Sequence, residues 1–171
     1  ELSMILIALG ANLGRVGLGG PHETCLAALA QLETLGVEVQ AVSRWYESAP
    51  VPASDQPWYV NAVARVNCTL DPTELLALMH QVEAEFGRER GAANAARTLD
   101  LDLIDYDGQI RSEGEPPALP HPRAHERAFV LLPIRDIAPD WCHPGNRENV
   151  EDLISALPGN QDIRVLNPEQ R

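Results

Sequence analysis

The sequence contains no lysine, and all 13 of its basic residues are arginine. This absence excludes chemistry that depends on a lysine amine, including the phosphate-binding lysine of P-loop enzymes and Schiff-base catalysis. The 13 arginines stand against 25 acidic residues, which gives a formal net charge of -12. Because surfaces that bind nucleic acids are normally basic, this balance disfavours a nucleic-acid partner.

Cysteine and long apolar runs are also scarce. Cys25, Cys68 and Cys142 are widely spaced and form no C-x-x-C pair, so we expect three buried thiols in a reducing cytosol rather than a zinc or redox site. No segment approaches the roughly 20 apolar residues of a membrane span. Met4 is followed directly by a strand-like segment and not by a signal peptide. We therefore expect a cytoplasmic protein without a membrane partner.

The chain has the size of one globular domain, with 171 residues of which 44% are hydrophobic and 22% are charged. These values are typical of a soluble protein with a sizeable core. We expect a single domain over residues 4–168. Glu1 to Ser3 precede the first methionine, and we expect them to be a remnant of cloning without a structural role.

Hydrophobic periodicity predicts an α+β fold. Strands are predicted at Ile5–Leu9, Val37–Tyr46, Tyr59–Asn67 and Leu99–Tyr106. Helices are predicted between them, one beginning at Pro21 and ending before Gly36, and one capped by Asp71 and ending before Gly87. The order β-α-β-β-α-β is that of a ferredoxin-like antiparallel sheet covered by helices.

The C-terminal part is expected to extend this fold with further elements. A third helix is predicted over Ala124–Asp136, with Pro133 ending or kinking it. A short helix over Val150–Leu157 and an edge strand over Ile163–Leu166 are predicted to follow. We interpret these segments as a helix and strand extension of the same domain.

The main chemical signal is a pair of carboxylates on one predicted strand. Asp100 and Asp102 alternate with leucines, so both carboxylates share a face and their α carbons lie about 6.6 Å apart. Two carboxylates placed in this way can hold a pair of Mg²⁺ ions, which lie about 3.5–4 Å apart in two-metal sites. The spacing alone favours a solvated polar face on an edge strand, because pairs of acidic residues two positions apart arise often by chance.

Arginines cluster around this pair. Six of the 13 arginines fall within residues 88–127, namely Arg88, Arg90, Arg97, Arg111, Arg123 and Arg127. Guanidinium groups bind phosphate oxygens in a bidentate manner. Arginines beside paired aspartates therefore indicate a site for a metal-bound polyphosphate.

The segment Arg97-Thr98-Leu99-Asp100-Leu101-Asp102-Leu103-Ile104 resembles the signature of the 6-hydroxymethyl-7,8-dihydropterin pyrophosphokinase family of folate biosynthesis. Further motifs similar to those of the family occur in the same order, namely Ala8-Leu9-Gly10-Ala11-Asn12-Leu13-Gly14, Asp55-Gln56-Pro57-Trp58-Tyr59-Val60-Asn61-Ala62 and Pro120-His121. The resemblance runs from Ile5 to the C-terminal tail. It implies in-line attack of the pterin hydroxymethyl oxygen on the β-phosphorus of ATP, with AMP as the leaving group.

The resemblance also implies roles for individual residues. Asp100 and Asp102 would coordinate two Mg²⁺ ions, and Arg88 and Arg97 complete the implied catalytic set. The residues at the family's pterin-binding positions are Ser48, Val51, Tyr59, Asn61 and Phe129. The residues at its ATP-binding positions are Gln81, Glu83, Arg88, Arg97, Leu103, His121 and Arg127. Among the pterin-binding residues, Tyr59 and Phe129 match the aromatic pair that sandwiches the ring.

The chain departs from the family pattern just before the signature. Ala93-Asn94-Ala95-Ala96 stands where members often carry a basic residue, tryptophan, glycine and proline. We expect this loop to be mobile without ligand and to order when both substrates bind, because a catalytic lid must exclude water.

Two other functions remain open at this point. One is a D-x-D metal-dependent transferase that acts on a nucleotide sugar, and the other is a pterin- or nucleotide-binding module without catalysis. For the preferred function we expect ATP and 6-hydroxymethyl-7,8-dihydropterin as small-molecule partners and a monomeric enzyme.

Overall fold

The computed structural model describes residues 4–13, 19–50, 52–87, 99–112, 114 and 116–166. Its elements are, in chain order, β1 (Ile5–Ala11), α1 (Pro21–Thr34), β2 (Glu38–Val42), β3 (Tyr46–Ser48), β4 (Tyr59–Asn67), α2 (Pro72–Glu85), β5 (Asp100–Tyr106), the 3-10 helix η1 (Ala124–Glu126), α3 (Ala128–Ile137), α4 (Val150–Ser155) and β6 (Ile163–Val165).

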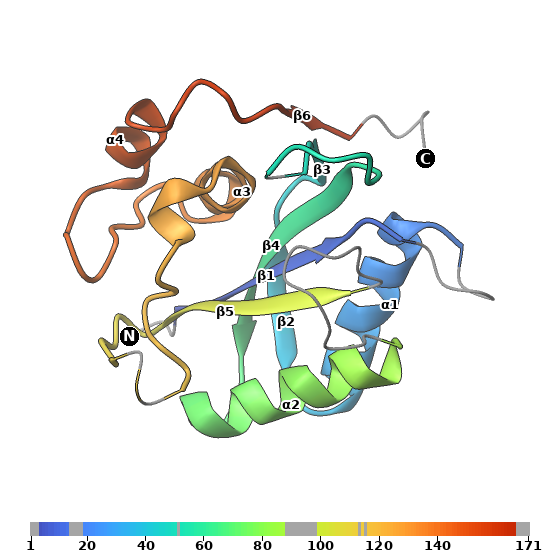
Figure 1. Cartoon of the computed structure of the whole chain (residues 1–171). Helices are drawn as coiled ribbons and strands as arrows, with labels where there is room; N and C mark the ends of the chain where they lie inside the picture. The colour runs from blue at the N-terminus through green and yellow to red at the C-terminus, as the bar shows by residue number, and fades with distance from the viewer. Residues whose placement is uncertain are drawn as a thin grey trace.

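The strands form one sheet in the order β5-β1-β4-β3-β6, and β2 also pairs with β4. All of these pairs are antiparallel. Helices α1 and α2 cover one face, and α3 and α4 cover the other (Figure 1). Along β1, Ile5 and Ile7 pack toward α1 and α2, whereas Leu6 packs toward α3 and α4. The predicted α+β class with an antiparallel, helix-covered sheet is confirmed.

One predicted strand is in fact two. The segment Val37–Tyr46 leaves the ladder after β2 and rejoins it only at β3. At Ser43, the side-chain hydroxyl accepts the Val63 main-chain N–H at 3.0 Å, in the place of a main-chain carbonyl. The Ser43 main-chain N–H still donates to the Val63 carbonyl at 2.9 Å, so the chain stays bonded to β4 between the two strands.

The predicted helix over Ala124–Asp136 is also divided. Arg127 is extended, with φ -116° and ψ 116°, and separates η1 from α3. Pro133 does not end α3, which continues to Ile137. Val130 and Ile134, on either side of this proline, are buried in the core between α3, α4 and the sheet. The burial of these two side chains stabilises α3 and offsets the helix hydrogen bond that Pro133 cannot make.

The three cysteines differ from the expectation of three buried thiols. All are free, but only Cys25 is buried, whereas Cys68 is half-buried and Cys142 is exposed. Trp141 and His143 on either side of Cys142 are buried, so alternation along this extended segment turns the Cys142 thiol outward. Burial raises the pKa of Cys25 to about 12. No helix in the described ranges is long and apolar enough to cross a membrane.

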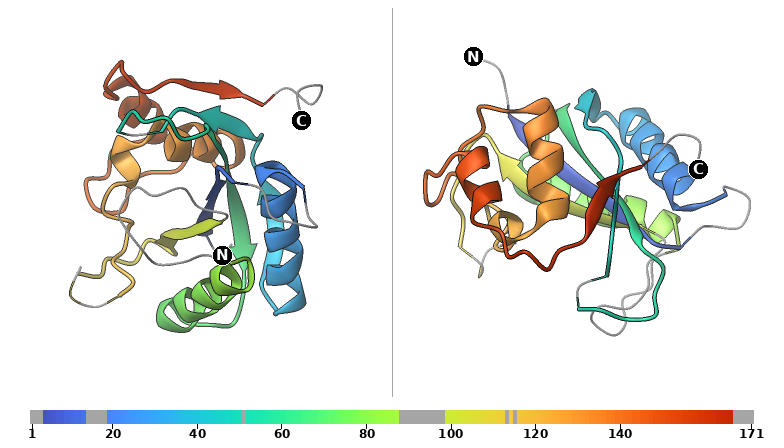
Figure 2. Two further views of the ribbon diagram at one scale, coloured as in Figure 1. Left: turned by 45° about the vertical axis from the view of Figure 1, so that its right-hand side comes forward. Right: turned by 90° about the horizontal axis from the view of Figure 1, so that it is seen from above.

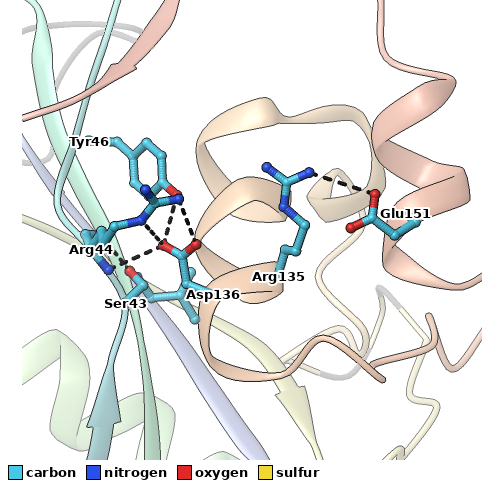
Figure 3. Close-up of polar contacts among 7 residues, drawn as sticks. Ser43, Arg44, Tyr46, Arg135, Asp136 and Glu151 are labelled. Atoms are coloured by element: carbon cyan, nitrogen blue, oxygen red, sulfur yellow. Dashed lines mark hydrogen bonds and ion pairs between the residues drawn. The ribbon is translucent and has the colours of Figure 1, made fainter.

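A polar network fixes α3 against the sheet (Figure 3). The Asp136 carboxylate accepts hydrogen bonds from the Arg44 guanidinium at 3.1 Å and from the Tyr46 hydroxyl at 2.7 Å. Burial and the bond to Asp136 raise the pKa of Tyr46 to about 12. On the other side of α3, Arg135 Nη1 lies 3.7 Å from Glu151 Oε2 of α4. The helix is thereby tied to β3 and to α4.

We expect Asp136→Ala to lower the free energy of unfolding by about 2 kcal/mol, because the substitution leaves the buried Tyr46 hydroxyl without its acceptor. For a chain of this length, the melting temperature should fall by roughly 4–8 °C. Arg135→Ala is the matched control, since it removes a more exposed ion pair of the same helix, and it should change stability by less than about 1 kcal/mol. Calorimetry measures both, and equal effects of the two variants would argue against the network.

Candidate active site

A cavity of about 1120 Å³ opens between β5, η1, α3 and the loops beside them. Ten of the residues proposed from the sequence line it, namely Ser48, Tyr59, Asn61, Glu83, Asp100, Asp102, Leu103, His121, Arg127 and Phe129. Val51, Arg88 and Arg97 lie outside the described residues, as does the loop Ala93–Ala96. Gln81 does not line the cavity, and its side chain donates to Glu85 at 3.2 Å.

Asp100 and Asp102 lie on β5, the edge strand, where they pair with Gly10 and Ala8 of β1. Both are half-buried and line the cavity, whereas Leu101 and Leu103 between and after them are buried. No group of three or more His, Cys, Asp or Glu side chains within the described ranges is placed to hold a metal ion. A pair of carboxylates nevertheless suits Mg²⁺, which is commonly bound by one or two carboxylates while phosphate oxygens and waters complete its shell.

His121 faces Asp102 from the loop before η1. Its Nδ1 accepts the Arg123 main-chain N–H at 3.2 Å, which places the proton of the neutral ring on Nε2. Burial, followed by the charge of Arg127, lowers the pKa of His121 to about 4. The 3.9 Å contact between His121 Nε2 and Asp102 Oδ1 is therefore not an ion pair at neutral pH. Nε2–H is instead a neutral donor directed at the carboxylate end of the cavity.

Arg127 connects the carboxylates to the aromatic end of the cavity. Its Nη1 lies 4.0 Å from Asp102 Oδ2. Its guanidinium carbon lies 5.4 Å from the centroid of the Phe129 ring, within the range of a cation–π contact. One arginine thus contacts a candidate metal ligand and a candidate pterin-stacking ring.

Glu83 has a structural task in addition to its position in the cavity wall. Its side chain is buried, and Oε2 accepts the Leu101 main-chain N–H at 2.9 Å. The N–H groups of an edge strand lack a partner strand on one side. By satisfying Leu101, Glu83 fixes the stretch of β5 that carries Asp100 and Asp102.

The helix face that meets the cavity carries Leu76, His80 and Glu83. These positions recur at four and three residues and therefore share one side of α2. The resemblance points to Gln81 and not to its neighbour His80, which lines the cavity. The spacing of three residues from His80 to Glu83 is the signal that could have identified it.

A buried polar pair also lines the cavity. Ser48 Oγ donates to Asn61 Oδ1 at 2.5 Å, and both side chains are buried. Gly10 pairs with Asn61 across β1 and β4. A Cβ atom on Gly10 would lie 3.0 Å from Asn61 Nδ2. A larger residue at position 10 would therefore crowd the Asn61 amide, and glycine avoids this contact. Tyr59, on the same face of β4, and Phe129 of α3 line the cavity beside the pair.

Comparisons with known proteins show the family of the chain. Residues 6–139 match a sequence model of the family 7,8-dihydro-6-hydroxymethylpterin-pyrophosphokinase. The chain is 35% identical to a 2-amino-4-hydroxy-6-hydroxymethyldihydropteridine pyrophosphokinase of Synechocystis over 96% of this chain and 86% of the relative. It is 37% identical to the enzyme of the same name from Haemophilus influenzae, over 95% of this chain and 97% of the relative.

The fold has solved counterparts as well. A crystal structure of the Plasmodium falciparum HPPK-DHPS triple mutant superposes with a TM-score of 0.66 at 13% identity, covering 91% of this chain and 44% of that chain. At this identity the likeness establishes the fold, and the sequence matches carry the family assignment. The chain belongs to the 7,8-dihydro-6-hydroxymethylpterin-pyrophosphokinase family.

Proposed function

We propose that this cavity binds ATP and 6-hydroxymethyl-7,8-dihydropterin together and transfers the ATP diphosphate to the pterin hydroxymethyl oxygen, giving AMP and the pterin diphosphate for folate biosynthesis. The observation that carries the proposal is that one cavity contains Asp100, Asp102, Tyr59 and Phe129. Family membership supports the reaction itself. It also favours this function over a nucleotide-sugar transferase or a non-catalytic binding module.

At the pterin end, Tyr59 and Phe129 hold the ring between their faces, and Asn61 bonds its polar edge. Because Ser48 donates to Asn61 Oδ1, the amide is held in one orientation with its NH₂ group as the donor left for the ring. Val51 is assigned to the pterin site from the resemblance to the family alone.

At the ATP end, Arg127 and the Nε2–H of His121 donate to phosphate oxygens, while Leu103 and Leu76 contribute apolar wall. A neutral donor and an arginine stabilise charge on the transferred group without a lysine. Arg88 and Arg97 complete this set on the family pattern alone.

Asp100 and Asp102 would hold two Mg²⁺ ions on the polyphosphate. When bound, Mg²⁺ neutralises phosphate charge and favours nucleophilic attack at phosphorus. The chain itself fixes both carboxylates on β5 through Glu83 and directs Arg127 toward Asp102. We further infer that the enzyme is a monomer and that it works in the cytoplasm, a reducing compartment that suits the three free cysteines.

Product analysis tests the function. Incubation with ATP, Mg²⁺ and 6-hydroxymethyl-7,8-dihydropterin is expected to give AMP and pterin diphosphate in equal amounts, and EDTA should stop both. Formation of ADP, or no turnover at all, would refute the assignment. Release of a sugar from a nucleotide sugar would instead support the transferase.

His80 and Gln81 offer a matched pair of neighbours on α2. We expect His80→Ala to raise the KM for ATP roughly tenfold, the loss of about one hydrogen bond from bound ligand. Gln81→Ala should leave the KM unchanged, because Gln81 does not line the cavity. Initial rates at varied ATP concentrations give the KM of both variants. A larger rise in KM for Gln81→Ala than for His80→Ala would mean that the Gln81 side of α2, and not the His80 side, faces ATP.

A further inference from the structure

Gln161, in the connection between α4 and β6, forms hydrogen bonds with the main chain on both sides of Arg127. Its Oε1 accepts the Ala128 main-chain N–H at 2.9 Å, and its Nε2 donates to the Glu126 carbonyl at 2.8 Å. Arg127 is the N-cap residue of α3 but makes no side-chain cap bond. Gln161 therefore supplies the missing cap from a segment more than thirty residues further along the chain.

The residues after Gln161 bond to the segment Ser48–Ala49, which also lines the cavity. The Asp162 carbonyl accepts the Ala49 main-chain N–H at 3.0 Å, and Ile163 then pairs with Ser48 as β6 joins β3. Figure 2 shows the connection running past the start of α3 to β6. Three consecutive residues thus join the segment that carries Phe129 to the segment that carries Ser48.

We propose that Gln161 is a positioning residue for the pterin: by fixing the main chain at Glu126 and Ala128, it sets where the Phe129 ring stands relative to the buried Ser48–Asn61 pair. This inference rests on the proposed function. Gln161 also lines the cavity, but because the main chain engages both ends of its amide, we expect it to act through α3.

The two substrates should respond differently to loss of the Gln161 hydrogen bonds. Phe129 has two side-chain torsions, so a shift of its backbone moves the ring directly. Arg127 has a long side chain with several rotatable bonds, and it can reach a phosphate from a range of backbone positions. Pterin binding should therefore depend on Gln161 much more than ATP binding does.

Gln161→Met tests this dependence, because methionine has a similar length and forms neither hydrogen bond. We expect the KM and the dissociation constant for 6-hydroxymethyl-7,8-dihydropterin to rise about tenfold, because the Phe129 ring is no longer held in place relative to the Ser48–Asn61 pair. The KM for ATP should change by less than about threefold. Gln31→Met is the matched control, since it removes a hydrogen bond from the Gln31 amide to the Glu85 carboxylate, between α1 and α2, and it should alter neither constant.

A double-mutant cycle with Phe129→Ala separates positioning from direct contact. If Gln161 acts through Phe129, adding Gln161→Met to Phe129→Ala should weaken pterin binding by less than twofold further. Additive losses, or equal losses for ATP and pterin, would overturn the inference. Wild-type pterin affinity in Gln161→Met, in a protein with normal circular dichroism, would also overturn it. A wild-type chain that neither binds the pterin nor forms AMP would instead defeat the proposed function.

Discussion

Asp100→Ala is expected to lower the rate of AMP formation by roughly 10³-fold or more. An effect of this size is typical when an enzyme loses a group that stabilises charge in the transition state. Asp100 and Asp102 share one face of β5 beside Arg127 and His121. Removing Asp100 would leave two Mg²⁺ ions to share the Asp102 carboxylate of this pair, which weakens their hold on the polyphosphate. Steady-state assays at saturating ATP and a range of Mg²⁺ concentrations measure the effect.

The fold of the Asp100→Ala variant should persist. Its side chain faces the cavity and is not part of either hydrophobic core, so the melting temperature should change by less than about 4 °C. Asp107→Asn is the matched control on the turn after β5, because Asp107 does not line the cavity and asparagine tolerates its positive φ of 54°. Full activity of Asp100→Ala at high Mg²⁺ would refute the metal role of this carboxylate.

Phe129→Ala is expected to raise the dissociation constant for the pterin by about 10–100-fold, the range typical of losing one aromatic platform under a stacked heterocycle. ATP affinity should fall far less. Arg127 loses its contact with the ring but keeps its approach to Asp102. Fluorescence titration of the pterin and calorimetry with a non-hydrolysable ATP analogue measure the two affinities separately.

Phe129→Leu refines this expectation. Leucine keeps most of the apolar volume without an aromatic face, so the loss of pterin affinity should lie between those of wild type and Phe129→Ala. Ile110→Ala serves as a control for removal of an exposed apolar side chain, since Ile110 is 69% exposed. Equal pterin affinity in Phe129→Ala and wild type would exclude stacking on this ring.

Strand periodicity carried the sequence prediction furthest. Side chains along a strand alternate between its two faces, so each residue can lie only on one face or the other. The alternation with leucines therefore predicts that Asp100 and Asp102 share a face. The start of α2 is also predicted correctly, because Asp71 and Glu74 have the spacing of a capping box, and they form one in the structure. These local signals are encoded within a few residues of the structure they produce.

Helix rotation and distant contacts were harder to predict. A helix turns by about 100° per residue, so Gln81 points away from the cavity that its neighbour His80 lines. Ser43 gives no local sign that its hydroxyl replaces a main-chain acceptor for Val63. The hydrogen bond between Gln161 and Ala128 joins segments far apart in sequence, and no periodicity within either segment indicates it.

The fate of the β-phosphorus is the most direct measurement of the proposed chemistry. With [β-³²P]ATP, Mg²⁺ and 6-hydroxymethyl-7,8-dihydropterin, all transferred label is expected in the pterin diphosphate, and AMP is expected to be unlabelled. Asp100→Ala should show neither product above background. Label that remains in ADP, with an unlabelled pterin monophosphate, would mean attack at the γ-phosphorus and would rule out diphosphate transfer.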